Sequence, residues 1–268
     1  MAATQTDRFP DPETLVAWQQ AAITAAHRGG DVLQQWVGRF SVREKSKANL
    51  VTEADEASQA AIVQSLSEEF PDHGFLGEED LKQHSDTSAP LWIIDPLDGT
   101  SNYVHGFPYY AVSIAIAIEG TVLAGVIYDP NRRETFSAAA GLGATLNGQS
   151  IQTSGETDPR QTMALASLPV CADPGNPAVT RFLKALPQLQ TVQRTGSAAL
   201  NLASVACGRA DAFWSTSLNA WDVAAGVLLV QEAGGSVTNV AGEPVDIFLP
   251  SLLAAASETL RKDLVKVI

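Results

Sequence analysis

Apolar residues near the start of the chain recur at roughly the spacing of one helix face: Leu15, Trp18, Ala22, Ala25, Leu33 and Trp36. This pattern predicts an amphipathic helix. Asp11-Pro12-Glu13 fits its start, because Asp caps a helix, Pro suits the first helical position and an acidic side chain is favourable in the first turn. Gly29-Gly30 weakens the prediction in the middle. A second helix is predicted to begin at Thr52-Glu53-Ala54-Asp55 and to reach about Phe70.

From Leu91 onward the pattern changes to that of strands. Leu91-Trp92-Ile93-Ile94 is a short apolar run that fits a buried strand, and residues 112–118 alternate large apolar with small side chains. Residues 122–128 continue as a further strand, and Asn147-Gly148 predicts a tight hairpin. The first half is therefore expected to pack helices against a largely antiparallel sheet.

After a loose stretch at residues 154–160, strands and helices alternate. Residues 197–207 and 223–233 are expected to be helical, and Gly208 and Gly234 fit their ends. The second half is therefore expected to be α/β, with a boundary near residue 155. A length of 268 residues fits one large domain or two intimate lobes.

Composition and charge narrow the classes of partner. Apolar residues make up 45% and charged residues 18%, which allows a large core and argues against global disorder. A formal net charge of −13 repels phosphate backbones and anionic lipid, so we expect neither nucleic acid nor membrane as a partner. Cys171 and Cys207 stand alone, without a metal-binding spacing. No secretory signal and no long apolar run is apparent, which indicates a soluble, cytoplasmic protein.

The most informative segment is Trp92-Ile-Ile-Asp-Pro-Leu-Asp-Gly-Thr-Ser-Asn102. We expect a buried strand to end at Asp95 and Pro96 to redirect the chain, so that Asp98 converges on Asp95. Two carboxylates repel one another unless a cation lies between them, and Mg²⁺ prefers such oxygen ligands. If Gly99-Thr100 begins a helical turn, its N–H groups face an incoming anion such as phosphate. The alternative is a simple turn, since Asp-Pro-x-Asp-Gly is rich in turn formers.

Three further acidic segments can each be explained by local structure when considered alone. Gly77-Glu78-Glu79-Asp80 fits a solvated loop, and Asp222, in Trp221-Asp-Val-Ala-Ala-Gly226, fits a helix cap. Asp55, three residues after Thr52, fits a variant of the capping box. None of these segments alone indicates a function.

Together these segments resemble one family. The central run, extended through Tyr103-Val-His-Gly-Phe-Pro108, stands in family order and spacing with Gly77-Glu78-Glu79 and the Trp221-Asp222 segment. Leu50-Val-Thr-Glu-Ala-Asp55 and Arg194-Thr-Gly-Ser-Ala-Ala-Leu-Asn201 also match. The chain thereby resembles the inositol monophosphatase family of Mg²⁺-dependent, Li⁺-sensitive phosphatases over about residues 15–245.

The resemblance implies the fold and the assembly. It predicts a layered αβαβα sandwich of the inositol monophosphatase and fructose-1,6-bisphosphatase type, α+β in its first part and α/β in its second. It implies a single domain over residues 1–268, with lobes at about 1–155 and 156–268. It also implies a homodimer.

The resemblance further implies roles for individual residues. Glu78, Asp95 and the carbonyl of Leu97 resemble the ligands of a first metal, and Asp95, Asp98 and Asp222 those of a second. Two or three Mg²⁺ ions per site are implied. The implied catalytic residues are Asp55, Thr100 and Glu78, with Asp55 and Thr100 aiming the attacking water. The implied substrate-binding residues are Gly99, Thr100, Gly196, Ser197, Ala198 and Ser215, and Lys45 or Lys47 resembles the family lysine.

The expected reaction is hydrolysis of a phosphate monoester by in-line attack of a metal-activated water, with inositol 1-phosphate or a related polyol or sugar phosphate as substrate. Alternatives of the same fold are histidinol-phosphate phosphatase, fructose-1,6-bisphosphatase and a nucleotidase. A different class is a catalytically silent oligomeric scaffold. Ser215 stands where relatives suited to inositol usually carry glutamate, which predicts weak discrimination among polyol and sugar phosphates.

Overall fold

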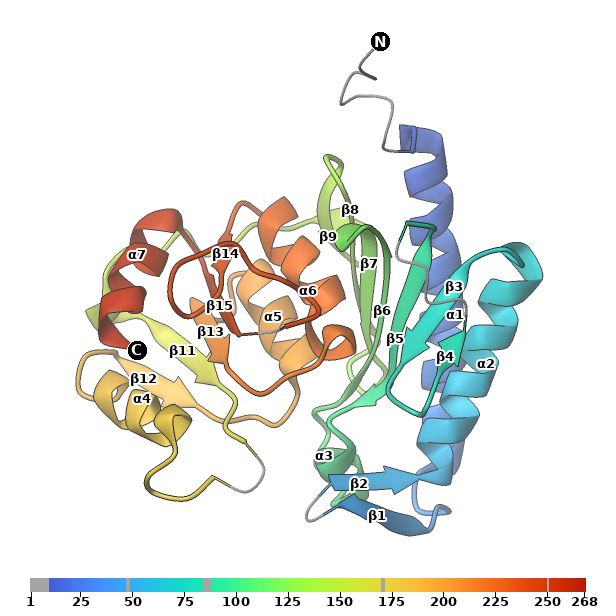
Figure 1. Cartoon of the computed structure of the whole chain (residues 1–268), viewed down its shortest axis with the longest axis horizontal. Helices are drawn as coiled ribbons and strands as arrows, with labels where there is room; N and C mark the ends of the chain where they lie inside the picture. The colour runs from blue at the N-terminus through green and yellow to red at the C-terminus, as the bar shows by residue number, and fades with distance from the viewer. Residues whose placement is uncertain (1–9, 47–48, 84–87, 170–171, 250) are drawn as a thin grey trace.

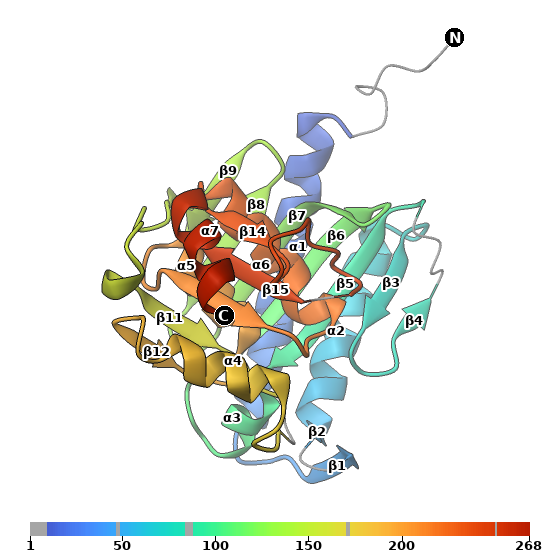
Figure 2. The same cartoon turned by 60° about the vertical axis from the view of Figure 1, so that its left-hand side comes forward.

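The computed structural model describes residues 10–46, 49–83, 88–169, 172–249 and 251–268, so that Lys47 and Cys171 lie outside the described part. Within that part, five layers follow one another (Figures 1 and 2). Two outer layers of helices enclose two sheets, and a central pair of helices lies between the sheets. The expected αβαβα sandwich is confirmed.

The helices fall into three layers. The first outer layer is α1 (Pro12–Trp36) and α2 (Glu53–Glu69), the central pair is α5 (Ala198–Ala206) and α6 (Ala220–Glu232), and the second outer layer is α4 (Pro177–Ala185) and α7 (Glu258–Val267). A short helix, α3 (Thr100–Val104), and a single 3₁₀ turn, η2 (Pro159–Gln161), complete the described helical elements. Among the described residues, no helix combines the length and the apolar character needed to cross a membrane.

The larger sheet has eight described strands in the order β10-β9-β8-β7-β6-β5-β3-β4. They are β3 (Gly74–Gly77), β4 (Lys82–Gln83), β5 (Leu91–Asp98), β6 (Ala111–Ile118), β7 (Thr121–Asp129), β8 (Glu134–Ala139), β9 (Gly143–Leu146) and β10 (Gln149–Ser150). Only the β3–β5 pair is parallel, so the prediction of a largely antiparallel sheet is confirmed.

The smaller sheet has five described strands in the order β12-β11-β13-β15-β14. They are β11 (Met163–Ala166), β12 (Thr191–Gln193), β13 (Ala212–Ser215), β14 (Ser236–Thr238) and β15 (Leu252–Ala255). β11 pairs in parallel with β12 and β13, whereas β15 is antiparallel to its neighbours. We propose a lobe boundary near residue 155, between the last strand of the larger sheet and β11.

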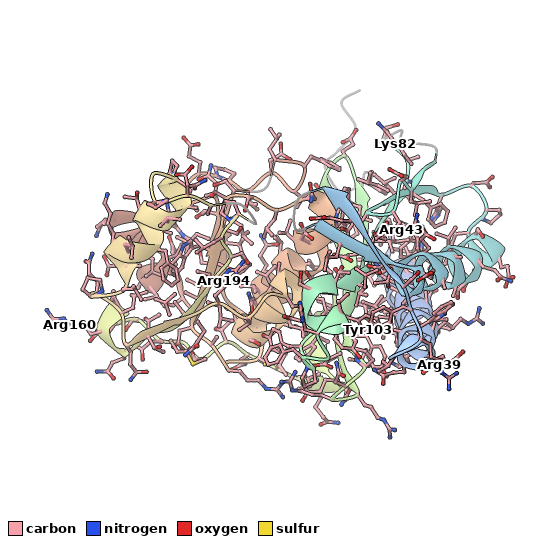
Figure 3. The ribbon with its side chains drawn as sticks, turned by 90° about the horizontal axis from the view of Figure 1, so that it is seen from below. Arg39, Arg43, Lys82, Tyr103, Arg160 and Arg194 are labelled. Carbon is pink, nitrogen blue, oxygen red and sulfur yellow. The ribbon has the colours of Figure 1, made fainter. Side chains whose placement is uncertain are left out.

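A separate hairpin of β1 (Val42–Ser46) and β2 (Asn49–Thr52) contacts α3 at one end of the molecule. Figure 3 views the chain from this end, with Arg43 labelled on the hairpin, Tyr103 on α3 and Arg194 on the side of the smaller sheet. This end also carries the turn that follows β5, so it is the end at which the candidate site lies.

Both faces of the central strands β5, β6 and β7 are buried, which explains why these strands contain so few polar residues. Trp92 and Ile94 of β5 pack in the cluster under α1 and α2, whereas Leu91 and Ile93 pack toward α5 and α6. β6 follows the same alternation: its valine and isoleucines face α1, and its alanines face α6. The small side chains on one face let α6 approach the sheet closely.

Two predictions about local structure are corrected. Gly29-Gly30 does not weaken α1, which is continuous across the pair. A Cβ at Gly29 would lie 2.8 Å from the Ile62 side chain and one at Gly30 would lie 2.5 Å from Tyr128, so both glycines permit close packing of α1. In addition, β5 does not end at Asp95 but continues to Asp98 through an irregularity in its pairing with β6.

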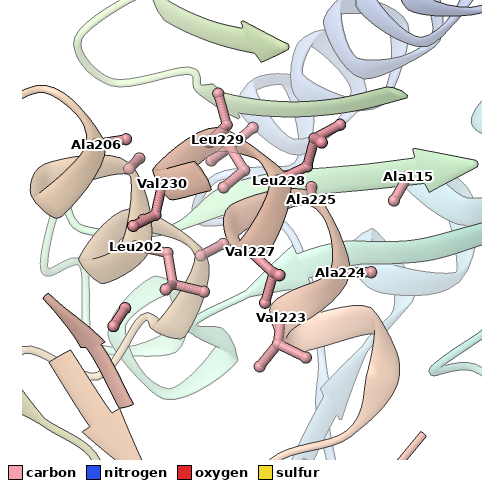
Figure 4. Packing of buried hydrophobic residues seen from close by; sticks show 14 of the residues in the cluster. Ala115, Leu202, Ala206, Val223, Ala224, Ala225, Val227, Leu228, Leu229 and Val230 are labelled. Atoms are coloured by element: carbon pink, nitrogen blue, oxygen red, sulfur yellow. The ribbon is translucent and has the colours of Figure 1, made fainter. Parts of the chain in front are cut away.

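The central helices pack closely against each other, and Figure 4 shows Leu202 of α5 directed toward α6 near Val227 and Val230. A Cβ built on Gly226 of α6 would lie 2.4 Å from the Cβ of Leu202. On the opposite side of α6, a Cβ on Gly125 of β7 would lie 2.9 Å from the Cα of Ala225. Glycine at these two positions therefore sets how closely α6 approaches α5 and the larger sheet.

We expect Gly226→Val to lower the free energy of unfolding by about 1–3 kcal/mol, because the added methyl groups overlap Leu202 and force α5 and α6 apart. Urea unfolding measures the change. Gln231→Val is the matched control, since Gln231 is an exposed residue of the same helix and its replacement should change stability by less than about 0.5 kcal/mol. Equal stability of the two variants would contradict this account of the packing.

Candidate active site

The site is built on a bulge in β5. Asp95 is paired with Ser113 of β6 and Asp98 with Ala111, so three steps along β5 correspond to two along β6. In a regular strand, residues three apart face opposite sides of the sheet. The one extra residue shifts the alternation, and Leu97 accordingly packs with Trp92 and Ile94 under α1 and α2. Asp95 and Asp98 therefore both face α5 and α6.

Local contacts hold the bulge in place. The Leu97 N–H donates to Oδ1 of Asp95 at 3.0 Å, and Ser58 Oγ of α2 donates to the Pro96 carbonyl at 3.1 Å. Pro96 has no N–H to donate to the β6 ladder, so an interruption at this position leaves no donor unpaired. The predicted convergence of the two aspartates is present, but a bulge within the strand produces it rather than the end of the strand.

Asp222 completes a cluster of three carboxylates. Asp95, Asp98 and Asp222 each offer an oxygen within 4.8 Å of the others. Asp222 occupies the third position of α6, where its Oδ2 accepts the Asn219 N–H at 2.6 Å as part of a capping box. Ser113, the β6 partner of Asp95, donates from Oγ to the Trp221 carbonyl at 3.2 Å and so ties the start of α6 to the larger sheet.

Asp98 is bound to the N-terminus of α5. Its Oδ2 accepts from the Ser197 hydroxyl and, at 2.8 Å, from the Ala199 N–H. Its Oδ1 accepts from the Ala198 N–H at 3.3 Å. A carboxylate is favourable at a helix N-terminus because the backbone N–H groups there have no partner within the helix. The predicted residues Ser197 and Ala198 are thus brought against Asp98.

Asp55 and Thr100 are brought together, as expected. Thr100 Oγ1 lies 3.3 Å from Asp55 Oδ1 and 3.2 Å from the Leu97 carbonyl oxygen, so its single proton can be donated to either. The other Asp55 oxygen accepts from Thr52, at 2.8 Å from its N–H and 2.6 Å from its hydroxyl, in the capping box of α2. One carboxylate oxygen therefore serves the helix, and the other remains directed at Thr100.

Glu78 lies beside Asp95 but outside the tight cluster. Gly77, the last residue of β3, pairs with Ile94, so residue 78 follows next to residue 95. Gln59 of α2 holds the loop by donating to the Glu79 carbonyl at 2.9 Å and accepting the Glu79 N–H at 3.3 Å. The loop predicted as acidic is thereby fixed at the edge of the site.

The turn after β5 has the expected helical start. Gly99 caps α3 in the left-handed region, with φ of 97°. A Cβ there would lie 3.0 Å from the Tyr109 carbonyl oxygen and 3.4 Å from the Gly196 carbonyl oxygen. Gly99 thus has both a conformational and a steric reason to be glycine, and Gly196 is brought directly against it.

Ser215 is not joined to the cluster by any described contact. It is the last residue of β13 and is 1% exposed, and its Oγ accepts the Ser217 N–H at 3.4 Å. Lys45 belongs to β1, and its side chain lies outside the described part of the structure. Their roles in substrate binding remain predictions.

Burial and mutual repulsion raise the pKa values of the carboxyl groups. Burial, followed by the charge of Asp98, raises the pKa of Asp222 to about 7. Burial raises the pKa of Asp98 to about 6 against the opposing effect of its bonds to α5, and raises that of Asp55 to about 6 against its bonds to Thr52. The pKa of Asp95 is raised by burial and then by Glu78, Asp98 and Asp222.

This donor set fits a hard divalent cation. Among the residues whose side chains the structure describes, which excludes Lys45 and Lys47, no lysine or arginine forms an ion pair with Asp95, Asp98 or Asp222. Clustered carboxylates without a cationic side chain are strongly unfavourable as anions. A bound cation removes this repulsion, and carboxylate and carbonyl oxygens are the ligands that Mg²⁺ and related ions prefer.

Sequence patterns gave no sign of several residues that support the site. Gln59, Ser113 and Asn219 act through single contacts with segments distant in sequence or through a cap, and none belongs to a recognisable motif. Asn102 lies inside the central motif, and its place in that motif is the sequence signal that could have identified it. Its side chain joins two segments that are distant in sequence.

Comparison with known proteins agrees with this geometry. The model of the inositol monophosphatase family matches residues 15–268. Nus factor SuhB of Xylella fastidiosa is 42% identical over 224 residues, covering 82% of this chain and 81% of that protein. Inositol monophosphatase 2 of Solanum lycopersicum is 39% identical over 234 residues, covering 84% and 88%.

A solved inositol monophosphatase structure from Anabaena matches with a TM-score of 0.86 and 38% identity, covering 95% of this chain and 96% of that one. The fold is thus shared over nearly the whole length. The family match also spans the cluster of three carboxylates and the turn after β5. The chain therefore belongs to the inositol monophosphatase family and is a phosphoric monoester hydrolase.

Proposed function

We propose that the protein is a Mg²⁺-dependent phosphatase of inositol 1-phosphate or a related polyol or sugar phosphate. The observation that carries the proposal is the placement of Asp95, Asp98 and Asp222 around one point, with the Asp55–Thr100 pair beside it. Two or three Mg²⁺ ions would be held by these aspartates, Glu78 and the Leu97 carbonyl. Li⁺ sensitivity and a homodimer are proposals that rest on the resemblance to the family. A cytoplasmic location is a separate proposal from the sequence.

A bound divalent cation supplies charge neutralisation and Lewis acidity at the phosphate. The residues of the chain orient the reaction. Thr100, by donating its proton to Asp55, turns its oxygen lone pair toward an attacking water, and Asp55 then takes up the proton that the water loses. The N–H groups of Gly99 and Thr100 donate to the phosphate oxygens and hold the phosphorus in line with that water.

The alcohol half of the substrate would lie against Gly196, Ser197 and Ala198, and the resemblance to the family implies Ser215 as a further contact. Ser215 is neutral and short, whereas a glutamate at this position would accept charge-assisted hydrogen bonds from ring hydroxyls. Such a bond is worth roughly 1.5–3 kcal/mol. Its absence supports a broad rather than a narrow range of polyol and sugar phosphates.

Asp222→Asn is expected to weaken cation binding while leaving the capping bond to Asn219 available. Mg²⁺ at about a hundred times its Kd should stabilise the wild type by about 2.7 kcal/mol. We expect a Tm increase of several degrees in the wild type and less than half of it in the variant. Phosphate release should fall by at least roughly 10- to 100-fold.

Without divalent cations, the same variant should unfold at the wild-type temperature or above, because one of three repelling carboxylates has been removed. Asp246→Asn is the matched control, since Asp246 also accepts a backbone N–H, from Phe248 at 2.9 Å. It should change neither the Mg²⁺-induced shift nor the rate. An Asp222→Asn protein with the full Mg²⁺-induced shift would refute the metal assignment.

Thr100→Val should lower kcat strongly with little change in KM, because the missing hydroxyl orients water in the transition state rather than binding substrate. Thr100→Ser retains the hydroxyl and should recover most of the rate. Steady-state kinetics of both variants at saturating Mg²⁺ test this. A change confined to KM would make Thr100 a binding residue only.

The wild type is expected to hydrolyse several polyol and sugar phosphates with kcat/KM values within about tenfold, a spread of about 1.4 kcal/mol. Ser215→Glu should shift the preference toward inositol 1-phosphate, and Ser215→Ala is the control that adds no carboxylate. A panel including histidinol phosphate, fructose 1,6-bisphosphate and a nucleotide separates the alternatives. A strong wild-type preference for any single ester would show that another residue supplies recognition.

A further inference from the structure

Asn102 of α3 joins two segments that are distant in sequence. Its Nδ2 donates to the Tyr109 carbonyl at 2.7 Å and to the Thr195 carbonyl at 2.9 Å. Tyr109 precedes β6, in the part of the chain that forms the larger sheet, whereas Thr195 lies between β12 and α5. One carboxamide group thus connects the turn after β5 with the loop that leads into α5.

The side chains of the same two residues converge on a second asparagine. Thr195 Oγ1 donates to Oδ1 of Asn201 at 2.5 Å, and the Tyr109 hydroxyl donates to the same oxygen at 3.2 Å. Asn201 is on α5 and is fully buried. Asn102, Thr195, Asn201 and Tyr109 therefore form a closed ring of hydrogen bonds, in which backbone carbonyls bind Asn102 and hydroxyls bind Asn201.

The chemistry of the ring requires a carboxamide at residue 102. An NH₂ group has two protons and can donate to both carbonyls at once. A carboxylate of the same shape has none and would repel both carbonyl oxygens. Asn102→Asp therefore removes the donor while keeping the volume.

The ring lies directly beside the residues proposed to bind substrate. A Cβ on Gly196 would lie 2.9 Å from Nδ2 of Asn102, so the loop packs tightly on the ring. Two residues further on, the Ala198 N–H reaches Asp98. Movement of the loop would therefore move the surface proposed to receive the alcohol half relative to the turn at Gly99.

We propose that Asn102 and Asn201 are positioning residues that set the spacing between the phosphate turn at Gly99–Thr100 and the alcohol-binding loop at 195–198. This inference rests on the proposed function for the placement of the alcohol half. It assigns the ring to recognition of that half, whereas the bonds from residues 197–199 to Asp98 hold the start of α5 at the metal centre. A misplacement of about 1 Å at such a loop can cost roughly a hundredfold in rate.

The test compares Asn102→Asp with Asn176→Asp. Asn176 is a matched control because its Oδ1 accepts the Ala178 N–H at 2.9 Å at the start of α4, and an aspartate can cap a helix equally well. Each variant is assayed with the polyol or sugar phosphate that the wild type hydrolyses best and with p-nitrophenyl phosphate, which lacks polyol hydroxyls. Hydrogen exchange of residues 195–197 is measured in parallel.

Asn102→Asp should lower kcat/KM for the polyol or sugar phosphate by roughly a hundredfold and for p-nitrophenyl phosphate far less. Exchange at residues 195–197 should become faster, while the Mg²⁺-induced Tm shift stays at the wild-type value. Asn176→Asp should match the wild type in all three measurements. If Asn102→Asp does not fold, Thr195→Val is tested instead, because it removes only the hydrogen bond that one hydroxyl group donates. It should show the same substrate dependence to a smaller extent.

Equal losses with both substrates, or unchanged exchange in the loop, would overturn the proposal. If the wild type hydrolyses p-nitrophenyl phosphate but no polyol or sugar phosphate, the substrate proposal fails. In that case, the exchange rates of the loop and the Mg²⁺-induced Tm shift of Asn102→Asp, compared with the wild type, still decide whether the ring holds the loop independently of the metal centre.

Discussion

The bulge in β5 is the constraint on which the site depends. Without the extra residue between Asp95 and Asp98, strand alternation would place one carboxylate under α1 and α2 and the other toward α6. With it, both reach the side where Asp222 lies. The neighbouring contacts follow from this arrangement: Asp98 binds the start of α5, Ser113 opposite Asp95 holds the start of α6, and the chain continues into the turn at Gly99.

Helix ends supply most of the remaining geometry. Asp55 and Asp222 each occupy the third position of a helix and close a capping box with one oxygen, so the backbone fixes the direction of the other. Stability and chemistry thus share the same carboxyl groups. Burial disfavours the charged form of both groups, because it raises the pKa of Asp55 to about 6 and that of Asp222 to about 7. A bound cation would relieve the repulsion among the carboxylates of Asp95, Asp98 and Asp222.

Local patterns were sufficient to predict much of this structure. The starts of α1 and α2, the strand at Leu91, the Asn147-Gly148 hairpin and the helices ending near Gly208 and Gly234 depend on neighbouring residues, and each is present. The resemblance of the central motif, together with the Leu50–Asp55 and Trp221–Gly226 segments, predicted the three aspartates and the Asp55–Thr100 pair. The bulge could not be predicted, because it depends on pairing with β6, and neither could the close packing at Gly29-Gly30, which depends on Ile62 and Tyr128.

The position of α6 has a consequence for synthesis. The strands of the larger sheet all precede residue 151, yet the helix that covers their alanine-rich face is residues 220–232. All described strands of this sheet are therefore synthesised while the helix that covers one apolar face is still missing. Until α6 emerges and docks, that face is a surface for which chaperones and other nascent chains compete.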